Sequence, residues 1–124
     1  MNYLAIDYGS KRIGLAVATD GIIEPILAIK NDKNIFDNIK KIIVYYQIEK
    51  IFVGMSEGEF SLITKKFVED LKNMVTLSIE TTEEAVSTIE ADKIFLLNHK
   101  KKKDYKKNID SIAAAVILRR VINS

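Results

Sequence analysis

Three carboxylates stand at places in this 124-residue chain where a fold could bring them together. Asp7 follows the apolar run 4–6, Glu80 follows the run 74–79, and Asp110 comes early in the last apolar-periodic segment. Carboxylate oxygens carried by separate rigid elements are suitable ligands for hard divalent cations such as Mg²⁺ or Mn²⁺. Each acid also has a simpler interpretation, as a turn residue, a solvent-facing residue or a partner of a helix dipole. The hypothesis of a metal site therefore depends on the three acids meeting.

Cations lie beside this candidate site and in one dense segment. Lys11 and Arg12 are at the tip of a predicted hairpin that carries Asp7. Residues 98–107 hold six lysines and one aspartate, which is +5 in a chain of net charge +2 and leaves −3 for the remainder. The lysines are Lys100, Lys101, Lys102, Lys103, Lys106 and Lys107. A basic segment on a mildly acidic body is typical of proteins that bind a polyanion, and a solvated polar loop is the alternative.

Apolar patterns predict the strands that must position these residues. Residues 4–17 predict a β-hairpin, because a short apolar run is followed by a reversal at Gly9 and then by alternation over 13–17. Residues 22–30 predict a third strand, which we place at a sheet edge because Pro25 lacks a backbone N–H. Two further strands are predicted over 50–55 and 74–79.

Helical spacing predicts the connections between these strands. A first helix begins at Ile35 and ends before Glu49. A second follows a capping box at 56–59 and places Phe60, Ile63, Phe67 and Leu71 on one face, and a third begins at a capping box over 81–84 and runs to residue 97. Residues 98–107 are predicted as a basic loop. Asn108 is then predicted to cap a final helix with Asp110 in its first turn.

This order of elements predicts a mixed α/β fold. We expect a five-stranded sheet in which the first three strands form an antiparallel meander and the last two run parallel to the first, with helices on the faces. Sites in such sheets form at the carboxyl ends of the parallel strands. Asp7, the segment 54–57 and Glu80 are all expected at those ends. The length is consistent with a single domain over residues 1–124.

Composition excludes several classes of protein. The chain has no cysteine, which excludes disulfides, thiol nucleophiles and zinc–thiolate sites. No apolar run approaches the roughly 20 residues needed to span a bilayer, and the first residues lack the pattern of a secretory signal. We therefore expect a cytoplasmic protein with no membrane partner, as a monomer or a weak homodimer.

An ordered set of motifs resembles the YqgF/RuvX family, whose members have an RNase H-like fold. The sequence D-Y-G-S-K-R-I-G-L-A-V over 7–17 is similar to the family's opening signature, and T-T-E-E-A over 81–85 is similar to its T-T-x-E-A motif. V-G at 53–54 and S-E-G at 56–58 resemble a family loop. The basic segment followed by I-D-S and A-A-A-V-I-L over 109–118 resembles the family's end. Members are described as Holliday-junction-resolvase-like and as pre-16S rRNA nucleases.

The resemblance implies a function and a site. It implies a metal-dependent endonuclease, a hydrolase acting on structured nucleic acid, with precursor rRNA in ribosome biogenesis or branched DNA as partner. Asp7, Glu80 and Asp110 would hold two Mg²⁺ or Mn²⁺ ions, with Asp7 bridging them. Lys11, Arg12 and the six lysines of 98–107 would contact the phosphate backbone without reading sequence.

The chain departs from the family pattern in two places. Met55 leads directly to Ser56, where the family has V-G-L-P and several polar residues before S-E-G. Residues 77–79, Leu-Ser-Ile, stand where the family has Asp-Glu-Arg. Glu80 takes the acidic place only if a short deletion is allowed, and Glu57 is an alternative second acid.

These departures leave rival interpretations open. A catalytically impaired module of the same fold would bind nucleic acid or a ribosomal precursor without cutting it. A more distant alternative is an actin-like or sugar-kinase-like ATPase, because D-x-G followed by a later glycine also opens that fold. Those enzymes need a second phosphate loop, and no second D-x-G occurs in this sequence.

Overall fold

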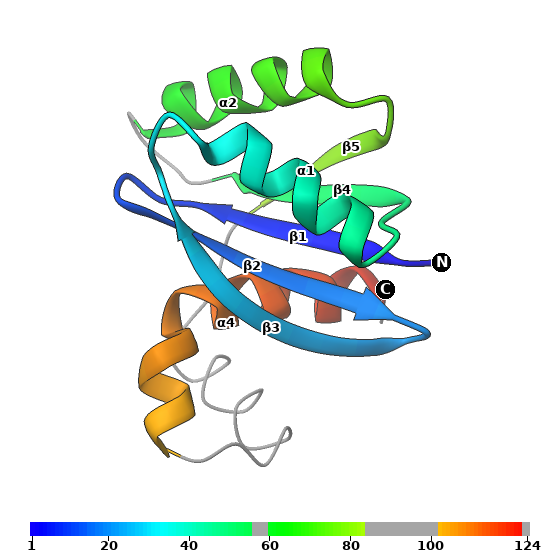
Figure 1. Cartoon of the computed structure of the whole chain (residues 1–124), viewed down its shortest axis with the longest axis vertical. Helices are drawn as coiled ribbons and strands as arrows, with labels where there is room; N and C mark the ends of the chain where they lie inside the picture. The colour runs from blue at the N-terminus through cyan, green and yellow to red at the C-terminus, as the bar shows by residue number, and fades with distance from the viewer. Residues whose placement is uncertain (56–59, 84–101, 123–124) are drawn as a thin grey trace.

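The structure is a computed structural model that describes residues 1–55, 60–83 and 102–122, with the backbone alone described for residues 83 and 102–110. The elements follow one another along the chain as strands and helices that Figure 1 labels. They are β1 (Tyr3–Tyr8), β2 (Arg12–Thr19), β3 (Ile22–Lys30), α1 (Ile35–Tyr45), β4 (Lys50–Met55), α2 (Phe60–Met74), β5 (Ser78–Glu83) and α4 (Lys102–Ile122).

The strands form one five-stranded sheet in the order β3-β2-β1-β4-β5. β1 pairs antiparallel with β2, and β2 pairs antiparallel with β3. β1 and β4 are parallel, as are β4 and β5. The predicted mixed sheet, an antiparallel meander followed by two parallel strands, is therefore confirmed. β1, the strand that carries Asp7, lies at its centre.

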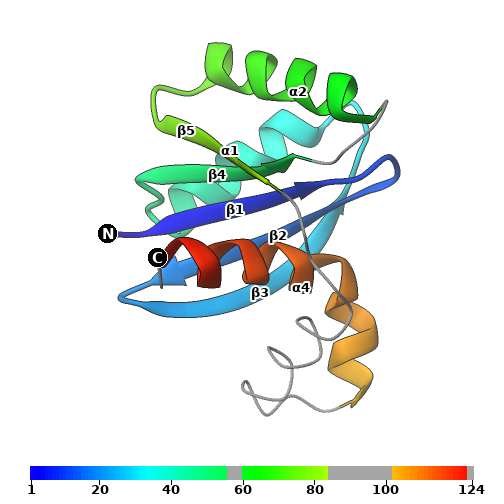
Figure 2. The same cartoon turned by 180° about the vertical axis from the view of Figure 1, so that it is seen from behind.

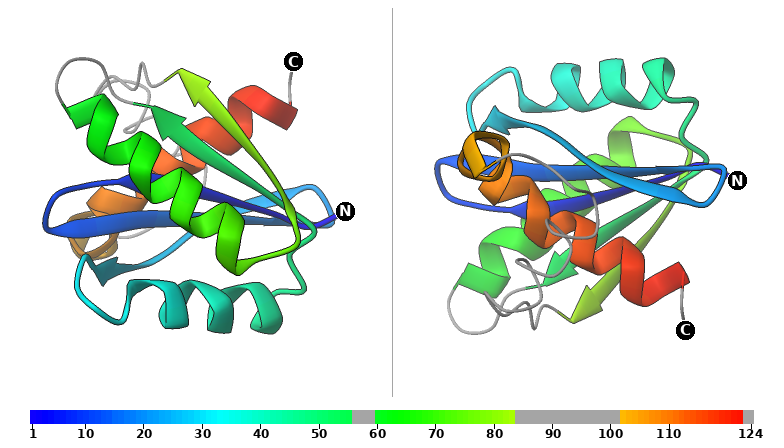
Figure 3. Two further views of the ribbon diagram at one scale, coloured as in Figure 1. Left: turned by 90° about the horizontal axis from the view of Figure 1, so that it is seen from above. Right: turned by 90° about the horizontal axis from the view of Figure 1, so that it is seen from below.

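Helices cover both faces of this sheet (Figures 1 and 3). α1 and α2 pack on one face against large apolar side chains of the strands, such as Leu4, Ile6, Leu15 and Val53. α4 packs on the other face, where β1 and β2 present alanines. The alternation of side chains along a strand produces these two unlike faces from one sequence. Small side chains on the α4 face let that helix approach the sheet closely.

A buried hydrogen bond fixes α4 to the sheet. The backbone N–H of Leu15 donates to Oγ of Ser111 at 3.2 Å, and both residues are fully buried. The pairing of β2 with β3 shifts register between Ile13 and Leu15, and such an irregularity interrupts the regular strand hydrogen bonds. Ser111 therefore supplies an acceptor inside the core at the place where the ladder is irregular.

The last strand lies four residues later than the sequence predicted. Residues 74–79 were expected to form it, but α2 continues to Met74 and the N–H of Val75 still donates to the carbonyl of Leu71 at 3.1 Å. Val75 and Leu77 then pack on the α1/α2 core without entering the sheet. β5 is Ser78–Glu83 and includes Thr81 and Thr82, whose β-branched side chains suit a strand. The predicted cap at Thr81 is therefore wrong.

The final helix begins six residues before the predicted cap. α4 starts at Lys102, so Asn108 lies inside the helix and residues 102–107 are helical, although a loop was predicted for them. Lysine has a good helix propensity, which lets the helix extend through this segment. Asp110 consequently lies in the third turn, beyond the reach of the helix dipole at the N-terminus.

The predicted first helix is confirmed, and the predicted buried face of the second helix is confirmed only in part. α1 begins at Ile35 and ends at Tyr45, within the predicted range. On α2, Phe67 and Leu71 are buried as predicted, but Ile63 is exposed and Thr64 takes its place on the buried side. The capping box at 56–59 and the predicted third helix over 84–97 lie outside the described residues.

We predict that Ser111→Ala destabilises the fold by about 1–3 kcal/mol, because it leaves the buried N–H of Leu15 without an acceptor. Urea unfolding of the purified variant would measure this loss. Thr64→Val is a matched control, because the Thr64 hydroxyl donates at 3.1 Å to the Phe60 carbonyl, a group that α2 already pairs in its own ladder. An equal loss in both variants would contradict the proposed importance of the Leu15–Ser111 bond.

Candidate functional site

Asp7 lies in a row of the sheet in which both neighbouring positions are glycines. Its pairing partners are Gly14 on β2 and Gly54 on β4, so neither neighbouring strand puts a side chain beside it. Asp7 is half-buried and has the same strand parity as Ala5, which packs under α4. The carboxyl group therefore lies on the α4 face, at the carboxyl end of the central parallel strand.

The aromatic residue after Asp7 anchors the end of β1. The ring of Tyr8 stacks on Phe67 with centroids 4.3 Å apart and on Phe60 with centroids 5.8 Å apart. Both partners belong to α2, on the opposite face of the sheet from α4. Because Tyr8 is held from that face, the position of Asp7 on the other face is fixed. An aromatic residue immediately after the candidate acid therefore helps to hold that acid in place.

The turn after β1 is tight and presents polar side chains. A Cβ atom built on Gly9 would collide with the backbone carbonyl oxygen of Arg12, so only glycine fits this turn without a shift. Ser10, Lys11 and Arg12 are exposed at its tip. The predicted location of Lys11 and Arg12 at a hairpin tip, two strand positions beyond the candidate acid, agrees with the structure.

The backbone brings residue 110 to the same part of the sheet as Asp7. Asp110 directly precedes Ser111, whose hydroxyl accepts from the N–H of Leu15. Leu15 follows Gly14, the residue that pairs with Asp7. The side chain of Asp110 lies outside the described residues. The backbone therefore places α4 over the strands that flank Asp7.

Glu80 lies away from this row. It pairs with Phe52 in the middle of β5, whereas the row of Asp7 and Gly54 continues to Thr82. Its Oε2 atom is 2.9 Å from Nζ of Lys50, toward the opposite end of the sheet. From strand geometry, the Cα atoms of Glu80 and Asp7 are about 12 Å apart, because Glu80 lies two strands across and two residues back along the strand. The expectation that Glu80 ends its strand is wrong, because the strand extends through Glu83.

Thr82 occupies the place in this row where an acid was expected. Its hydroxyl oxygen is buried and has no hydrogen-bond partner within the part of the chain that the structure describes. Buried hydroxyls are nearly always paired, so an unpaired one beside a candidate site is informative. Sequence reasoning missed Thr82 because the T-T motif was interpreted as a helix cap.

The lysine-rich first turns of α4 extend past the β3 edge of the sheet. These turns, orange in Figures 1 and 2, are on the same lateral side of the sheet as the β1–β2 turn but well away from it along the long axis of the molecule. Lys102, Lys103, Lys106 and Lys107 belong to these turns, with 102 and 106 and likewise 103 and 107 one turn apart. Lys100 and Lys101 lie outside the described residues.

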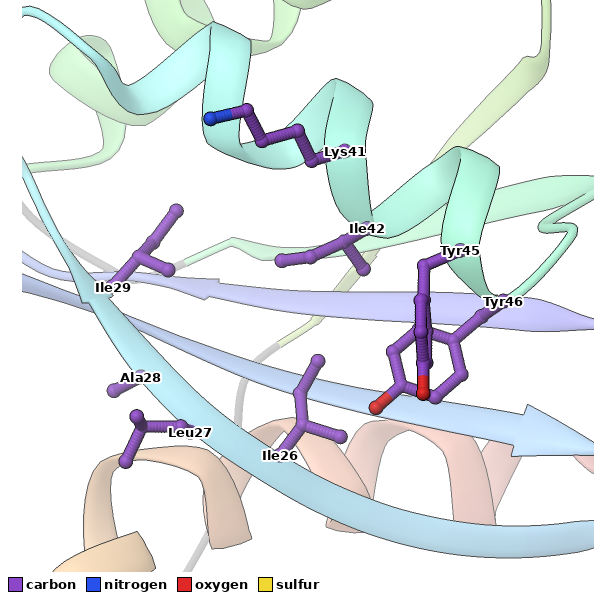
Figure 4. Close-up of a pocket in the computed structure, with 8 residues that line it drawn as sticks. All are labelled: Ile26, Leu27, Ala28, Ile29, Lys41, Ile42, Tyr45 and Tyr46. Atoms are coloured by element: carbon purple, nitrogen blue, oxygen red, sulfur yellow. The ribbon is translucent and has the colours of Figure 1, made fainter.

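An open groove of about 430 Å³ lies between β3 and α1, away from Asp7 (Figure 4). Its lining is mostly aliphatic, with the amine of Lys41 and the hydroxyls of Tyr45 and Tyr46 as its polar groups. Burial raises the pKa of the Tyr46 hydroxyl above its usual value, and nearby Glu24 and Tyr45 raise it further. The groove contains no carboxylate and is therefore unsuited to holding divalent metal ions.

Two features are absent from the part of the chain that the structure describes. No three His, Cys, Asp or Glu side chains gather there as a metal-binding group, and the side chain of Asp110 is not among the side chains described. Within the same residues, no helix combines the length and the apolar character that crossing a bilayer requires.

Solved structures share this architecture. The fowlpox virus resolvase in complex with substrate Holliday junction DNA has a TM-score of 0.61 at 16% identity, over 95% of this chain and 93% of that one. RuvC of T. thermophilus, in complex with a Holliday junction substrate, has a TM-score of 0.55 at 10% identity, over 93% and 90% of the two chains. At these identities the likeness establishes the fold, which is that of RuvC-like resolvases with an RNase H-like sheet.

Sequence comparison gives a closer relation. A protein of Sulfurihydrogenibium sp. (strain YO3AOP1) that carries the name pre-16S rRNA nuclease is 38% identical over 130 residues, covering 97% of this chain and 88% of that protein. A family model described as RuvX, Holliday junction resolvase, matches residues 1–124. The resemblance found in the motifs is thereby confirmed, and the chain belongs to the RuvX (YqgF) family.

Proposed function

We propose that this protein is a nuclease that hydrolyses phosphodiester bonds of structured nucleic acid with the help of divalent metal ions. The observation that carries the proposal is the row of Asp7, Gly14 and Gly54 beneath α4. The glycines on both sides leave this half-buried carboxylate without a neighbouring-strand side chain beside it. The arrangement supports a site at the carboxyl ends of β1 and β4, where sheets of this type bind their ligands.

The donor set fits Mg²⁺ or Mn²⁺. Asp7 and Asp110 supply hard oxygen ligands on a central strand and on the helix that packs over it. Bound there as a pair, such ions supply Lewis-acid activation of water and stabilisation of the leaving oxygen. The chain holds Asp7 in place through the strand anchored by Tyr8, and it holds the backbone at residue 110 in place through the helix that Ser111 ties to the sheet.

A simpler role for Asp110 finds less support in the fold. An aspartate in the first turn of a helix is explained by the dipole alone. Asp110 lies in the third turn of α4, where aspartate has no dipole to complement and a poor helix propensity. A functional role as a metal ligand supplies a reason for an acid at this position.

The third acid is either Glu80 or Glu57. Glu80 would have to leave its ion pair with Lys50 and reach over two residues along the strand and across β4 to join Asp7. Glu57 lies outside the described residues but follows the end of β4 by two positions, and β4 carries Gly54 beside Asp7. The geometry of the described residues therefore favours Glu57 as the third ligand, with Glu80 as the alternative.

Precursor rRNA is the substrate that we propose first, with 5′-end processing of pre-16S rRNA as the reaction. The name of the Sulfurihydrogenibium relative supports this choice, because that protein is 38% identical to this chain. Branched DNA is the alternative substrate, supported by the resolvase complexes of the same fold. Loss of the family's Asp-Glu-Arg motif, where Ser78 now starts β5, supports a second candidate, an impaired module that only binds.

We predict that Asp7→Asn lowers Mg²⁺-dependent cleavage of a precursor 16S rRNA fragment by more than about 100-fold. Loss of groups that merely orient metal ligands costs about 10–100-fold, so loss of a direct ligand is expected to cost more. Single-turnover cleavage with labelled RNA would measure the rate.

Asp20→Asn is the matched control for this substitution. Asp20 lies in the β2–β3 turn at the opposite end of the sheet, with φ of 52°, a conformation that asparagine tolerates well. Its variant is expected to cleave as the wild type does. Equal cleavage by wild type and Asp7→Asn would end the nuclease proposal, and binding without cleavage by the wild type would favour the impaired module.

The identity of the third acid can be tested by a second pair of variants. We predict that Glu57→Gln lowers cleavage by about 10-fold or more, whereas Glu80→Gln changes it by less than about 3-fold because Glu80 is engaged with Lys50. Titration with Mn²⁺ in a calorimeter would show whether the same variant loses metal affinity. A larger loss of rate and affinity in Glu80→Gln would assign the third ligand to Glu80.

The basic end of α4 gives a prediction about salt dependence. Replacing Lys106 and Lys107 by glutamine is expected to weaken nucleic-acid binding and to reduce the slope of log K against log salt by roughly 1–2, since each lost phosphate contact removes about 0.7–0.9. The control replaces Lys65 and Lys66, two adjacent lysines of α2 on the opposite face of the sheet. Equal changes of slope in both double variants would exclude a specific role for α4.

A further inference from the structure

The turn that follows Asp7 is held from outside the hairpin by one residue. Asn31 comes directly after β3, in the connection to α1, and is half-buried. Its side-chain Nδ2 donates to the carbonyl oxygen of Gly9 at 2.8 Å. Its backbone N–H donates to the carbonyl oxygen of Lys11 at 2.9 Å. Two carbonyl groups of a single turn are therefore bound by one asparagine 20 or more residues away in sequence.

The two bonds have different origins. The backbone bond continues the antiparallel pairing of β2 with β3, in which Arg12 pairs with Lys30, so any non-proline residue at position 31 could donate it. The side-chain bond reaches past the end of β2 to Gly9 and needs an amide donor of this length. Replacing the side chain at position 31 would therefore remove the hydrogen bond to the Gly9 carbonyl and leave the backbone bond to the Lys11 carbonyl in place.

The glycine at position 9 explains why the turn after β1 needs the two hydrogen bonds from Asn31. Gly9 allows the close approach to the Arg12 carbonyl oxygen, and the same residue carries the largest conformational entropy to be lost on ordering. A turn built on glycine and exposing Ser10, Lys11 and Arg12 would sample many conformations if its carbonyl groups were solvated. Bonds from Asn31 restrict it to one conformation before any ligand arrives.

We propose that Asn31 is a positioning residue, which through the Gly9 carbonyl holds the turn so that Lys11 and Arg12 meet a phosphate of nucleic acid bound beside Asp7. This inference rests on the proposed function, because the phosphate is that of the proposed substrate. Asn31 itself contacts neither the metal ions nor the reacting atoms. Its effect is carried by the turn, so it depends on the two basic side chains that the turn presents.

The proposal is tested with Asn31→Ala in two backgrounds, the wild type and a Lys11→Ala/Arg12→Ala double variant. Affinity for a fluorescent precursor 16S rRNA fragment is measured with Ca²⁺ in place of Mg²⁺, so that binding is followed without cleavage. We expect binding to weaken about 3- to 10-fold in the wild-type background, the range for loss of one hydrogen bond. In the double variant we expect less than about 2-fold, because the turn then has no basic side chains to position.

Hydrogen exchange gives a second readout that needs no substrate. The backbone amides of residues 9–12 are expected to exchange about 3- to 10-fold faster in Asn31→Ala, since the turn loses a restraining bond. Asn34→Ala is the matched control, because Asn34 lies three residues later at the start of α1 and its side chain makes no capping hydrogen bond. It is expected to change neither the exchange at 9–12 nor the affinity.

The outcomes separate this inference from the proposed function. Unchanged exchange at 9–12 in Asn31→Ala overturns the inference whatever the activity. Faster exchange with the same loss of affinity in both backgrounds also overturns it, because Asn31 would then act independently of Lys11 and Arg12. A wild type that binds no nucleic acid refutes the proposed function and, with it, the phosphate part of this inference. Faster exchange with coupled loss of affinity supports the proposal.

Discussion

The distance between α4 and the sheet is the constraint on which the candidate site depends. Ala5, Ala16 and Ala18 line the sheet beneath the helix, and Ala114 and Ala115 line the helix itself. Such side chains set a short separation, since larger ones would hold the layers apart. The hydrogen bond from the Leu15 N–H to Ser111 then fixes the helix along its axis, because a slide by one residue would break it. Packing sets the height of α4 over the sheet, and one polar contact sets its register, which in turn sets the place of residue 110.

The same sheet places only glycines beside the candidate acid. Glycine in a strand interior costs roughly 0.5–1 kcal/mol relative to alanine, and a central strand would ordinarily avoid it. Here Gly14 and Gly54 stand on both sides of Asp7, and the alanines Ala5 and Ala16 pair two residues further back. The glycines therefore cost stability in the row that holds the candidate acid. The nearby aromatic stack of Tyr8 on α2 offsets that loss by holding the end of β1 from the other face.

Sequence patterns predicted the sheet well because alternation and buried runs are properties of single strands and their order along the chain. They placed Asp7 and the hairpin tip correctly for the same reason.

Sequence patterns failed for β5, because 74–79 and 78–83 are both plausible strands. Only the pairing of Ser78 with Lys50 and the packing of Val75 on the core decide between them. They failed for the start of α4, because Asn108 can cap a helix but also tolerates its interior. Ser111, Asn31 and Thr82 were not assigned roles, since their partners are distant in sequence.

Electrostatics gives a reason for the distribution of charge in the chain. Carboxylates gathered at one end of a sheet repel one another and repel a phosphate backbone, so a site built from them needs cations to bind a nucleic acid at all. Bound metal ions would supply positive charge at the centre. The turn with Lys11 and Arg12 would supply it beside the end of β1, and the lysine-rich first turns of α4 would supply it past the β3 edge of the sheet (Figures 1 and 2). Because residues 98–107 carry +5 and the remainder of the chain −3, a polyanion is expected to be attracted to this basic segment more than to the rest of the surface.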